Sequence, residues 1–183
     1  NVRELAELAQ VLRHPGYEKF HRIYTNDNNE IIHHETVSCM MPSEASILSP
    51  EDDGKLSNLF GRMDNEIRTK KANKVYLIHN HPSTDPSPSS EDIEVTKNIA
   101  NLTTSDGKTS IISEKFAGHI ILDTDKYCEI KKDGSFDFGK IDEKYQIKMT
   151  DAELPSMNLG KVVNSPSAIA DLAKNLFDTS KTT

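Results

Sequence analysis

The segment Lys74–Asp92 reads KVYLIHNHPSTDPSPSSED and combines a short apolar run, a histidine pair and a loop rich in proline and serine. Val75–Ile78 is β-branched and aromatic, which predicts a buried strand that continues into His79 and His81. Because side chains alternate across a strand, these two histidines project to the same face. Two imidazoles at positions i and i+2 of one strand can bind a single metal ion.

A helix is predicted after the loop. Pro82 ends the strand, and Ser89 suits the N-cap of a helix with apolar residues at i, i+4 and i+7 from Val95. Asp92 falls in the first turn, where its carboxylate can fold back over the end of the strand as a third ligand. Two histidines and one carboxylate, with a fourth position left for water, give the ligand count of a catalytic zinc site. Such a zinc lowers the pKa of its water to about 7 and polarises a carbonyl group, which suits amide hydrolysis.

Each of these residues also has an ordinary structural interpretation. Paired histidines occur on strands without a metal, and a serine N-cap followed by a first-turn acid is a common helix start. The combination of a strand, His-x-His, a proline-rich loop and Ser-x-x-Asp, in this order, favours a metal site over these separate explanations.

The segment 79–92 resembles the JAMM signature of the JAB/MPN metallopeptidases. Its His-x-His-Pro-Ser start and Pro-Ser-x-x-Asp end are most similar to the RadC-like bacterial branch. Thr84 stands where that branch usually has glycine, which affects the loop and not a ligand. The resemblance extends to about Ile130 and implies that Ser89 helps to stabilise an oxyanion. It also implies three zinc ligands, which are His79, His81 and Asp92.

The resemblance further implies a glutamate that acts as general base. Glu18 is the candidate, because Tyr17–Phe20 resembles the Glu-x-Phe stretch of RadC-like chains, and Glu35 is the substitute. His119 matches the histidine of an Asp-His-hydrophobic stretch in these proteins, although Gly118 replaces the aspartate. For His119 we favour a structural role ahead of a contact with a metal ligand.

The remaining pattern predicts an α/β fold, a mixed sheet with flanking helices. Helices are expected at 2–13 and 50–70, and further strands at 18–25, 30–39, 109–113, 118–124, 127–131 and 135–138. The resemblance implies the MPN/JAB fold, a layered architecture like that of cytidine deaminases. We expect an MPN/JAB domain at 1–138, a linker or loosely packed arm at 139–163, and at 164–183 an amphipathic helix and polar end that could begin a next unit.

The composition limits the classes of function. The net charge of −7 argues against a broad nucleic-acid surface, which needs a basic patch. No apolar run has transmembrane length, and no signal peptide is recognised. Cys39 and Cys128 lack metal-binding spacing and are expected to be reduced residues of a cytoplasmic protein, with a disulfide between them left open. We interpret the initial Asn1 as the start of a piece of a longer polypeptide.

The sequence therefore predicts a zinc-dependent metallopeptidase, a hydrolase acting on a protein or peptide substrate such as a ubiquitin-like or other isopeptide. The alternative is a catalytically silent zinc-binding MPN module that serves as an interaction platform in a larger protein, associated with mobile elements or DNA repair. Neither direct nucleic-acid binding nor membrane contact is expected. The pattern leaves the substrate and the oligomeric state open.

Overall fold

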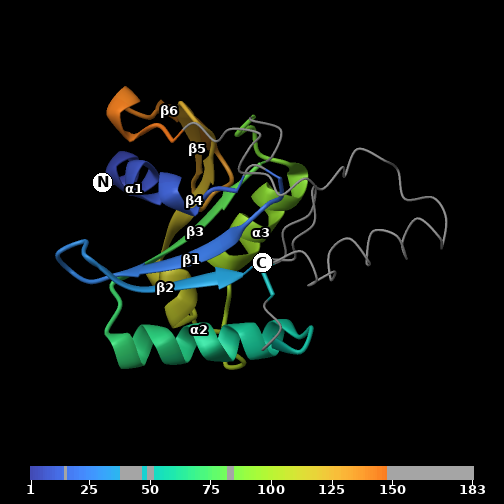
Figure 1. The fold of residues 1–183 in the computed structure, drawn as a ribbon. Helices are drawn as coiled ribbons and strands as arrows, with labels where there is room; N and C mark the ends of the chain where they lie inside the picture. The colour runs from blue at the N-terminus through green and yellow to red at the C-terminus, as the bar shows by residue number, and fades with distance from the viewer. Residues whose placement is uncertain (15, 38–46, 49–51, 82–84, 148–183) are drawn as a thin grey trace, which may run out of the picture. The chain divides into compact units, whose positions relative to one another are not determined.

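Six strands form one mixed sheet with the order β2-β1-β3-β4-β5-β6 (Figure 1). The computed structural model of the chain describes residues 1–14, 16–37, 47–48, 52–81 and 85–147. Neighbouring strands are antiparallel except β3 and β4, which run parallel. The strands are β1 (Phe20–Thr25), β2 (Ile31–Val37), β3 (Lys74–Asn80), β4 (Phe116–Leu122), β5 (Lys126–Ile130) and β6 (Phe136–Lys140).

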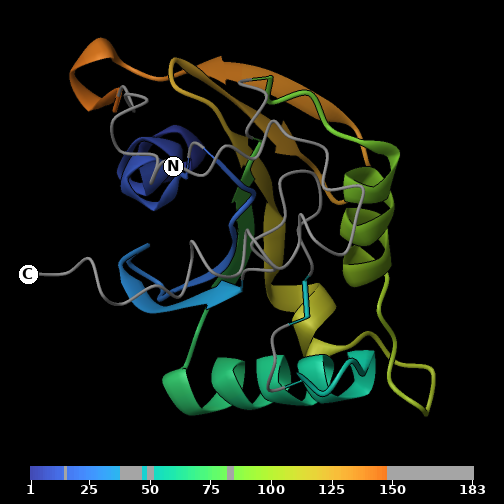
Figure 2. The ribbon, with the colours of Figure 1, turned by 45° about the vertical axis from the view of Figure 1, so that its right-hand side comes forward.

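Each face of the sheet carries its own apolar core, and Figure 2 shows α1 and α3 on opposite sides of the sheet. One core lies under α2, α3 and α4, and the other lies under α1 and the 3-10 turn η1. None of the helices in the described part of the chain is long and apolar enough to cross a membrane. The helical segments are α1 (Val2–Leu8), η1 (Ala9–Leu12), α2 (Leu56–Lys70), α3 (Ser90–Ala100) and α4 (Ile111–Lys115). The expected α/β fold with a mixed sheet and flanking helices is confirmed.

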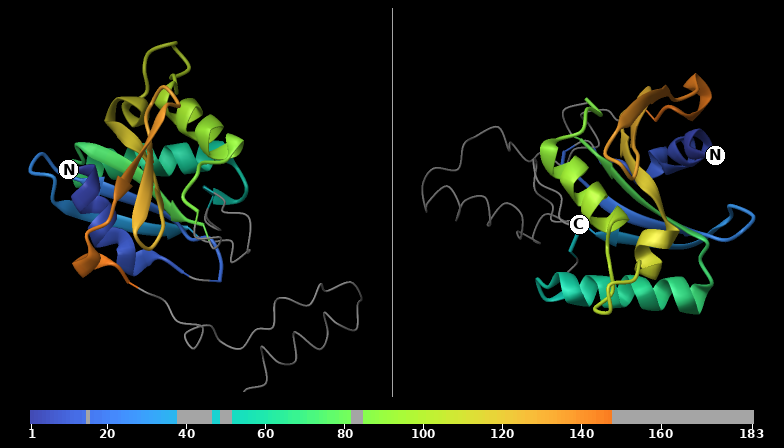
Figure 3. Two further views of the ribbon diagram at one scale, coloured as in Figure 1. Left: turned by 90° about the horizontal axis from the view of Figure 1, so that it is seen from above. Right: turned by 180° about the vertical axis from the view of Figure 1, so that it is seen from behind.

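The chain after β6 returns to α1 and forms the 3-10 turn η3 (Glu143–Tyr145) beside it (Figure 3). Ile141 is buried in the same core as Leu5, and the backbone N–H of Asp142 donates to Glu7 Oε1 at 3.2 Å. Packed structure therefore continues past residue 138, where the domain was expected to end. The expected helix at 164–183 and most of the expected arm lie outside the described residues, so this division of the chain stays a prediction.

A β-bulge in β4 decides which residues of this strand face α3. The register between β3 and β4 shifts after Phe116, so that Ala117 is an extra residue. Gly118 follows with a φ of 152°, a conformation that favours glycine. The extra residue shifts by one position the alternation of side chains between the two faces of the sheet. As a result Phe116 and His119 face the same side of the sheet, with His119 opposite Leu77 of the α2–α3–α4 core.

Two expectations about secondary structure are wrong. The segment 109–113, expected as a strand, leads into α4, where the Ser110 hydroxyl caps the helix by accepting from the backbone N–H of Ile112 at 3.2 Å. A short apolar run fits both a strand and a buried helix, and burial of Ile112 in the α2–α3–α4 core selects the helix here. The helix expected from residue 50 has its first regular α2 residue at Leu56, because Asp53 and the glycine after it have positive φ values of 49° and 67°.

Candidate metal centre

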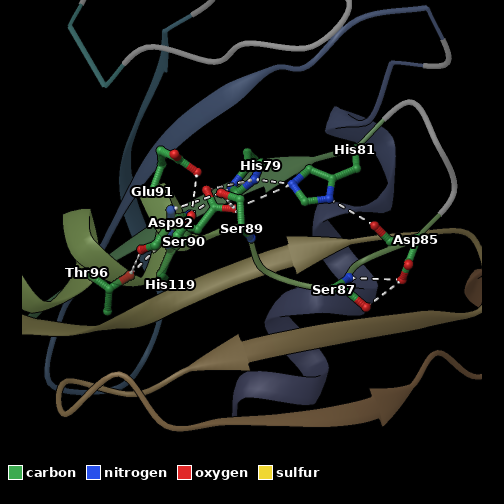
Figure 4. A network of polar contacts seen from close by, with 10 residues as sticks. All are labelled: His79, His81, Asp85, Ser87, Ser89, Ser90, Glu91, Asp92, Thr96 and His119. Carbon is green, nitrogen blue, oxygen red and sulfur yellow. Dashed lines mark hydrogen bonds and ion pairs between the residues drawn. The ribbon is translucent and has the colours of Figure 1, made fainter.

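The end of β3 and the first turn of α3 bring together the three residues that the sequence suggested as ligands (Figure 4). The Nε2 atoms of His79 and His81 are 2.9 Å apart. Asp92 presents Oδ1 at 3.4 Å from His79 Nε2 and Oδ2 at 3.6 Å from His81 Nε2. Two imidazole nitrogens and a carboxylate therefore converge on one point, so these residues could hold a metal ion.

The cap of α3 orients the Asp92 carboxylate. Ser89 is the N-cap residue and forms a capping box with Asp92. The backbone N–H and the hydroxyl of Ser89 both donate to Asp92 Oδ2, at 2.9 and 2.7 Å, and the hydroxyl oxygen accepts from the backbone N–H of Asp92 at 3.1 Å. These bonds hold one carboxylate oxygen and leave Oδ1 directed at His79. Asp92 therefore takes part in an ordinary helix cap and is a candidate metal ligand at the same time.

A hydrogen bond to a backbone carbonyl determines which ring nitrogen of His81 carries the hydrogen. Its Nδ1 lies 2.9 Å from the carbonyl oxygen of Asp85. Because a carbonyl only accepts, Nδ1 carries the hydrogen, and Nε2 of the neutral ring has a free lone pair. This lone pair faces the Nε2 atom of His79 and the carboxylate of Asp92. A cation bound between these electron-rich atoms would stabilise their close approach.

The electrostatics of the site also favour a cation. Burial raises the pKa of Asp92, but hydrogen bonding to His81 and the electrostatic interaction with His79 lower this pKa more, to well below its ordinary value. Burial lowers the pKa of His81, but hydrogen bonds and the negative charges of Asp92 and Glu18 outweigh it, so this pKa is raised. The carboxylate is therefore ionised, and either a proton on His81 or a metal ion can compensate its charge.

His119 lies on the far side of His79 and is completely buried. His79, Asp92 and His119 each offer a ligand atom within 4.8 Å of the others. Both nitrogens of His119 already have partners, however, because Nε2 is 2.8 Å from His79 Nδ1 and Nδ1 is 2.9 Å from Thr96 Oγ1. Burial lowers the pKa of His119 to about 4, so the ring is neutral at neutral pH. His81 therefore stays the expected third ligand. His119 contacts the candidate ligand His79, which is the role that the sequence analysis placed second to a structural one.

Glu18 lies just before β1, beside the histidines. β1 pairs Phe20 with His79, and continuing this antiparallel register by two residues brings Glu18 level with His81. The raised pKa of His81 includes a contribution from the Glu18 charge, which supports this placement. Glu18 is half-buried.

Glu35, the substitute for the general base, is engaged elsewhere. It lies on β2 opposite Arg22 of β1, with β1 between it and the strand of the histidines. Glu35 Oε2 is 2.5 Å from Arg22 Nη2, and Glu35 Oε1 is 2.6 Å from Arg62 Nη1. Two guanidinium groups therefore hold this carboxylate, which favours Glu18 as the base.

Asn80, between the two histidines, has a role that the sequence analysis missed. Its side chain is buried on the opposite face of β3. Nδ2 donates to the carbonyl oxygens of His14 and Tyr17 at 2.8 and 3.2 Å, and Oδ1 accepts from the backbone N–H groups of His14 and Lys19 at 3.3 and 3.4 Å. These bonds tie the segment that carries Glu18 to β3. The partner segment lies more than 60 residues away in sequence, so no local pattern indicates the contact.

The layered fold and the His-His-Asp group together define a class of protein. A six-stranded mixed sheet with helices on both faces, and possible metal ligands at the end of a central strand, is consistent with the JAB/MPN fold. Residues 65–135 match the family model described as the RadC-like JAB domain. The chain belongs to the RadC-like branch of the JAB/MPN family.

Curated relatives from several bacteria agree with this assignment. A UPF0758 protein of Geobacillus thermodenitrificans is 35% identical over 123 residues, which cover 67% of this chain and 47% of the relative. A UPF0758 protein of Listeria monocytogenes is 34% identical over 119 residues, 65% of this chain and 46% of the relative. One of Caldanaerobacter subterraneus is 30% identical over 131 residues, 72% of this chain and 49% of the relative. The chain spans about half the length of the curated relatives it matches.

Proposed function

We propose that this chain is a zinc-dependent hydrolase that cleaves peptide or isopeptide bonds. The observation that carries the proposal is the convergence of His79, His81 and Asp92 at the end of β3. Two imidazole nitrogens and a carboxylate oxygen suit Zn²⁺, and three protein ligands leave a further position accessible. A zinc ion held here would supply Lewis acidity to a carbonyl group and promote the ionisation of water.

Glu18 acts as general base in this proposal. Its carboxylate takes a proton from the attacking water, whose oxygen bonds to the carbonyl carbon of the substrate. The C–N bond then breaks, and Glu18 returns the proton to the leaving amine, which balances the reaction. The level of Glu18 with His81 in the β1–β3 register, and its effect on the pKa of His81, support this role.

Ser89 supplies a hydrogen bond to the oxyanion in this proposal. Its hydroxyl donates to Asp92 Oδ2 in the structure, so it must turn toward the substrate as negative charge develops on the carbonyl oxygen. The backbone N–H of Ser89, 2.9 Å from the same carboxylate oxygen, would continue to hold Asp92. A donor of this kind contributes about 3 kcal/mol to stabilisation of the transition state.

The partner in this proposal is a protein or peptide, and the setting is the cytoplasm. The net charge of −7 favours a polypeptide over nucleic acid as the direct partner. Cys128 is buried and has no disulfide partner among the described residues, as is usual in a reducing compartment. Cys39 lies outside the described residues, so its pairing with Cys128 stays open, as in the sequence analysis.

The test combines metal analysis with a cleavage assay on the full chain. Zinc is measured by plasma mass spectrometry, and cleavage of a mixed library of peptides and isopeptide-linked peptides is followed by mass spectrometry. We expect about one zinc per chain in the wild type. His79→Ala should lose zinc and cleavage together, whereas Glu18→Gln should keep zinc and reduce turnover by about 10²- to 10⁴-fold.

His33→Ala is the matched control, because this histidine lies on β2 and contacts Glu66 and Tyr24 instead of the site. It should keep both zinc and turnover. A wild-type chain without zinc, or a Glu18→Gln variant with full turnover, would contradict the proposal. Zinc without cleavage of any library member would instead support a silent zinc-binding module.

A further inference from the structure

A buried chain of hydrogen bonds runs from His79 through β4 and back to α3 (Figure 4). His79 Nδ1 is 2.8 Å from His119 Nε2, and His119 Nδ1 is 2.9 Å from Thr96 Oγ1. Thr96 Oγ1 in turn donates to the backbone carbonyl of Asp92 at 2.7 Å. His79 is 1% exposed, and His119 and Thr96 are fully buried, so water does not compete for these bonds.

We call the chain from His79 through His119 and Thr96 to the Asp92 carbonyl the relay. The Asp92 carbonyl, its last member, sets the direction of every bond in it. A backbone carbonyl only accepts, so the single hydroxyl hydrogen of Thr96 goes to Asp92. The Thr96 oxygen must then accept from Nδ1–H of His119, whose neutral form complete burial favours. A neutral ring protonated at Nδ1 has a free lone pair at Nε2, which accepts from Nδ1–H of His79. The relay therefore leaves Nε2 of His79 without a hydrogen, and this is the atom that faces His81 and Asp92.

We propose that His119 and Thr96 are positioning residues that fix His79 in the tautomer able to bind a metal. The inference rests on the proposed metal site. A histidine can carry its hydrogen on either ring nitrogen, and a hydrogen on Nε2 of His79 would block the ligand atom. The relay ends on the backbone of Asp92, so it also couples the strand that carries one ligand to the helix turn that carries another.

The two histidine ligands are held in different ways. His81 is fixed by one bond to a carbonyl of the following loop, at Asp85, and its side chain is 15% exposed. His79 depends on two side chains from separate elements, and its partner His119 reaches it because of the bulge in β4. Loss of such an outer partner typically lowers metal affinity by about 10- to 100-fold.

The experiment reads the tautomer directly in the metal-free full chain. With ¹⁵N-labelled histidine, long-range ¹H–¹⁵N correlations show which ring nitrogen of His79 carries the hydrogen. We expect Nδ1 in the wild type. Competition titration with a chelator then gives the zinc affinity, and urea unfolding gives the stability of each variant.

Thr96→Val removes one hydroxyl at constant shape, and His119→Phe keeps a ring without its nitrogens. Both should lower zinc affinity by about 10- to 100-fold. In both, the hydrogen of His79 should be distributed between Nδ1 and Nε2. Thr96→Ser keeps the hydroxyl, and His119→Gln offers an amide oxygen to His79 and an amide N–H to Thr96. These conservative variants keep the hydrogen-bonding groups, so they should retain most of the zinc affinity of the wild type. If Thr96 and His119 served only for packing, zinc affinity would not depend on whether these groups are present. Thr96→Val is the decisive variant if His119→Phe folds poorly.

The outcomes separate this inference from the proposed function. A wild-type chain that binds no zinc would overturn the metal site, and with it the role of the relay. A wild-type chain that binds zinc but carries the His79 hydrogen on Nε2 before loading would overturn the relay alone. A Thr96→Val variant with wild-type tautomer and wild-type affinity would do the same.

Discussion

Replacing Asn80 tests whether one buried amide holds the segment that carries Glu18 against the strand that carries His79. Asn80 is 2% exposed and makes four side-chain hydrogen bonds to the backbone of residues 14–19. Asn80→Ala removes all four and leaves two carbonyls and two N–H groups without their partner. We expect the segment to loosen and Glu18 to lose its fixed position beside the site.

The magnitude follows from the bond lengths. The two donations, at 2.8 and 3.2 Å, are the stronger pair, and a net hydrogen bond contributes about 1 kcal/mol. Asn80→Ala should therefore lower the free energy of unfolding by about 2 kcal/mol, and by about 4 kcal/mol if the two longer bonds contribute equally. Asn80→Asp should lower it at least as much, because its carboxylate would face two carbonyl oxygens without a donor. Urea unfolding of the metal-free chain, followed by circular dichroism, measures both variants.

Asn101→Ala is the matched control, since Asn101 is an exposed asparagine at the end of α3 with one side-chain bond to a helix carbonyl, at 2.7 Å. It should change the free energy of unfolding by about 0.5 kcal/mol or less. Asn80→Ala should keep its zinc while losing turnover, because Asn80 points away from the ligands. Wild-type stability in Asn80→Ala would refute the anchoring argument, and wild-type turnover would refute its link to Glu18.

Three further predictions concern caps, charge and pH. Ser89→Ala and Ser110→Ala each remove a helix N-cap and should each lower the free energy of unfolding by about 1 kcal/mol, but only the former should weaken zinc binding in a chelator titration. Glu35→Leu leaves the buried Arg22 without its carboxylate and should destabilise the chain by about 3 kcal/mol in urea, with unchanged zinc content; wild-type stability would contradict this. Burial and a neighbouring histidine lower the pKa of His21 to about 4, whereas the unfolded value is about 6.5. The unfolded chain therefore binds more protons in this window, so stability should fall by up to about 3 kcal/mol as the pH drops from 6.5 to 4, and His21→Phe should flatten that dependence in urea titrations.

Features that depend only on neighbouring residues could be predicted without a structure. The alternation of a strand places His79 and His81 on one face whatever the partner strands are. The cap at Ser89 is equally local, because it joins residues three apart and directs Asp92 toward the end of the strand. The convergence of His79, His81 and Asp92, the helix that follows them and the α/β class could therefore be predicted. The short run at 109–113 could not, because its periodicity fits a strand and a helix equally well.

Features that depend on the register between distant segments became visible only in the folded chain. The pairing of β1 with β3 brings Glu18 to the histidines, while Arg22 and Arg62 hold Glu35 away from them. One extra residue in β4 turns His119 toward His79, although simple alternation from Phe116 would send it to the opposite face. Side-chain alternation within a strand is set by the backbone of that strand. The level at which two strands meet is set by the packing of the whole sheet, which no short stretch of sequence contains.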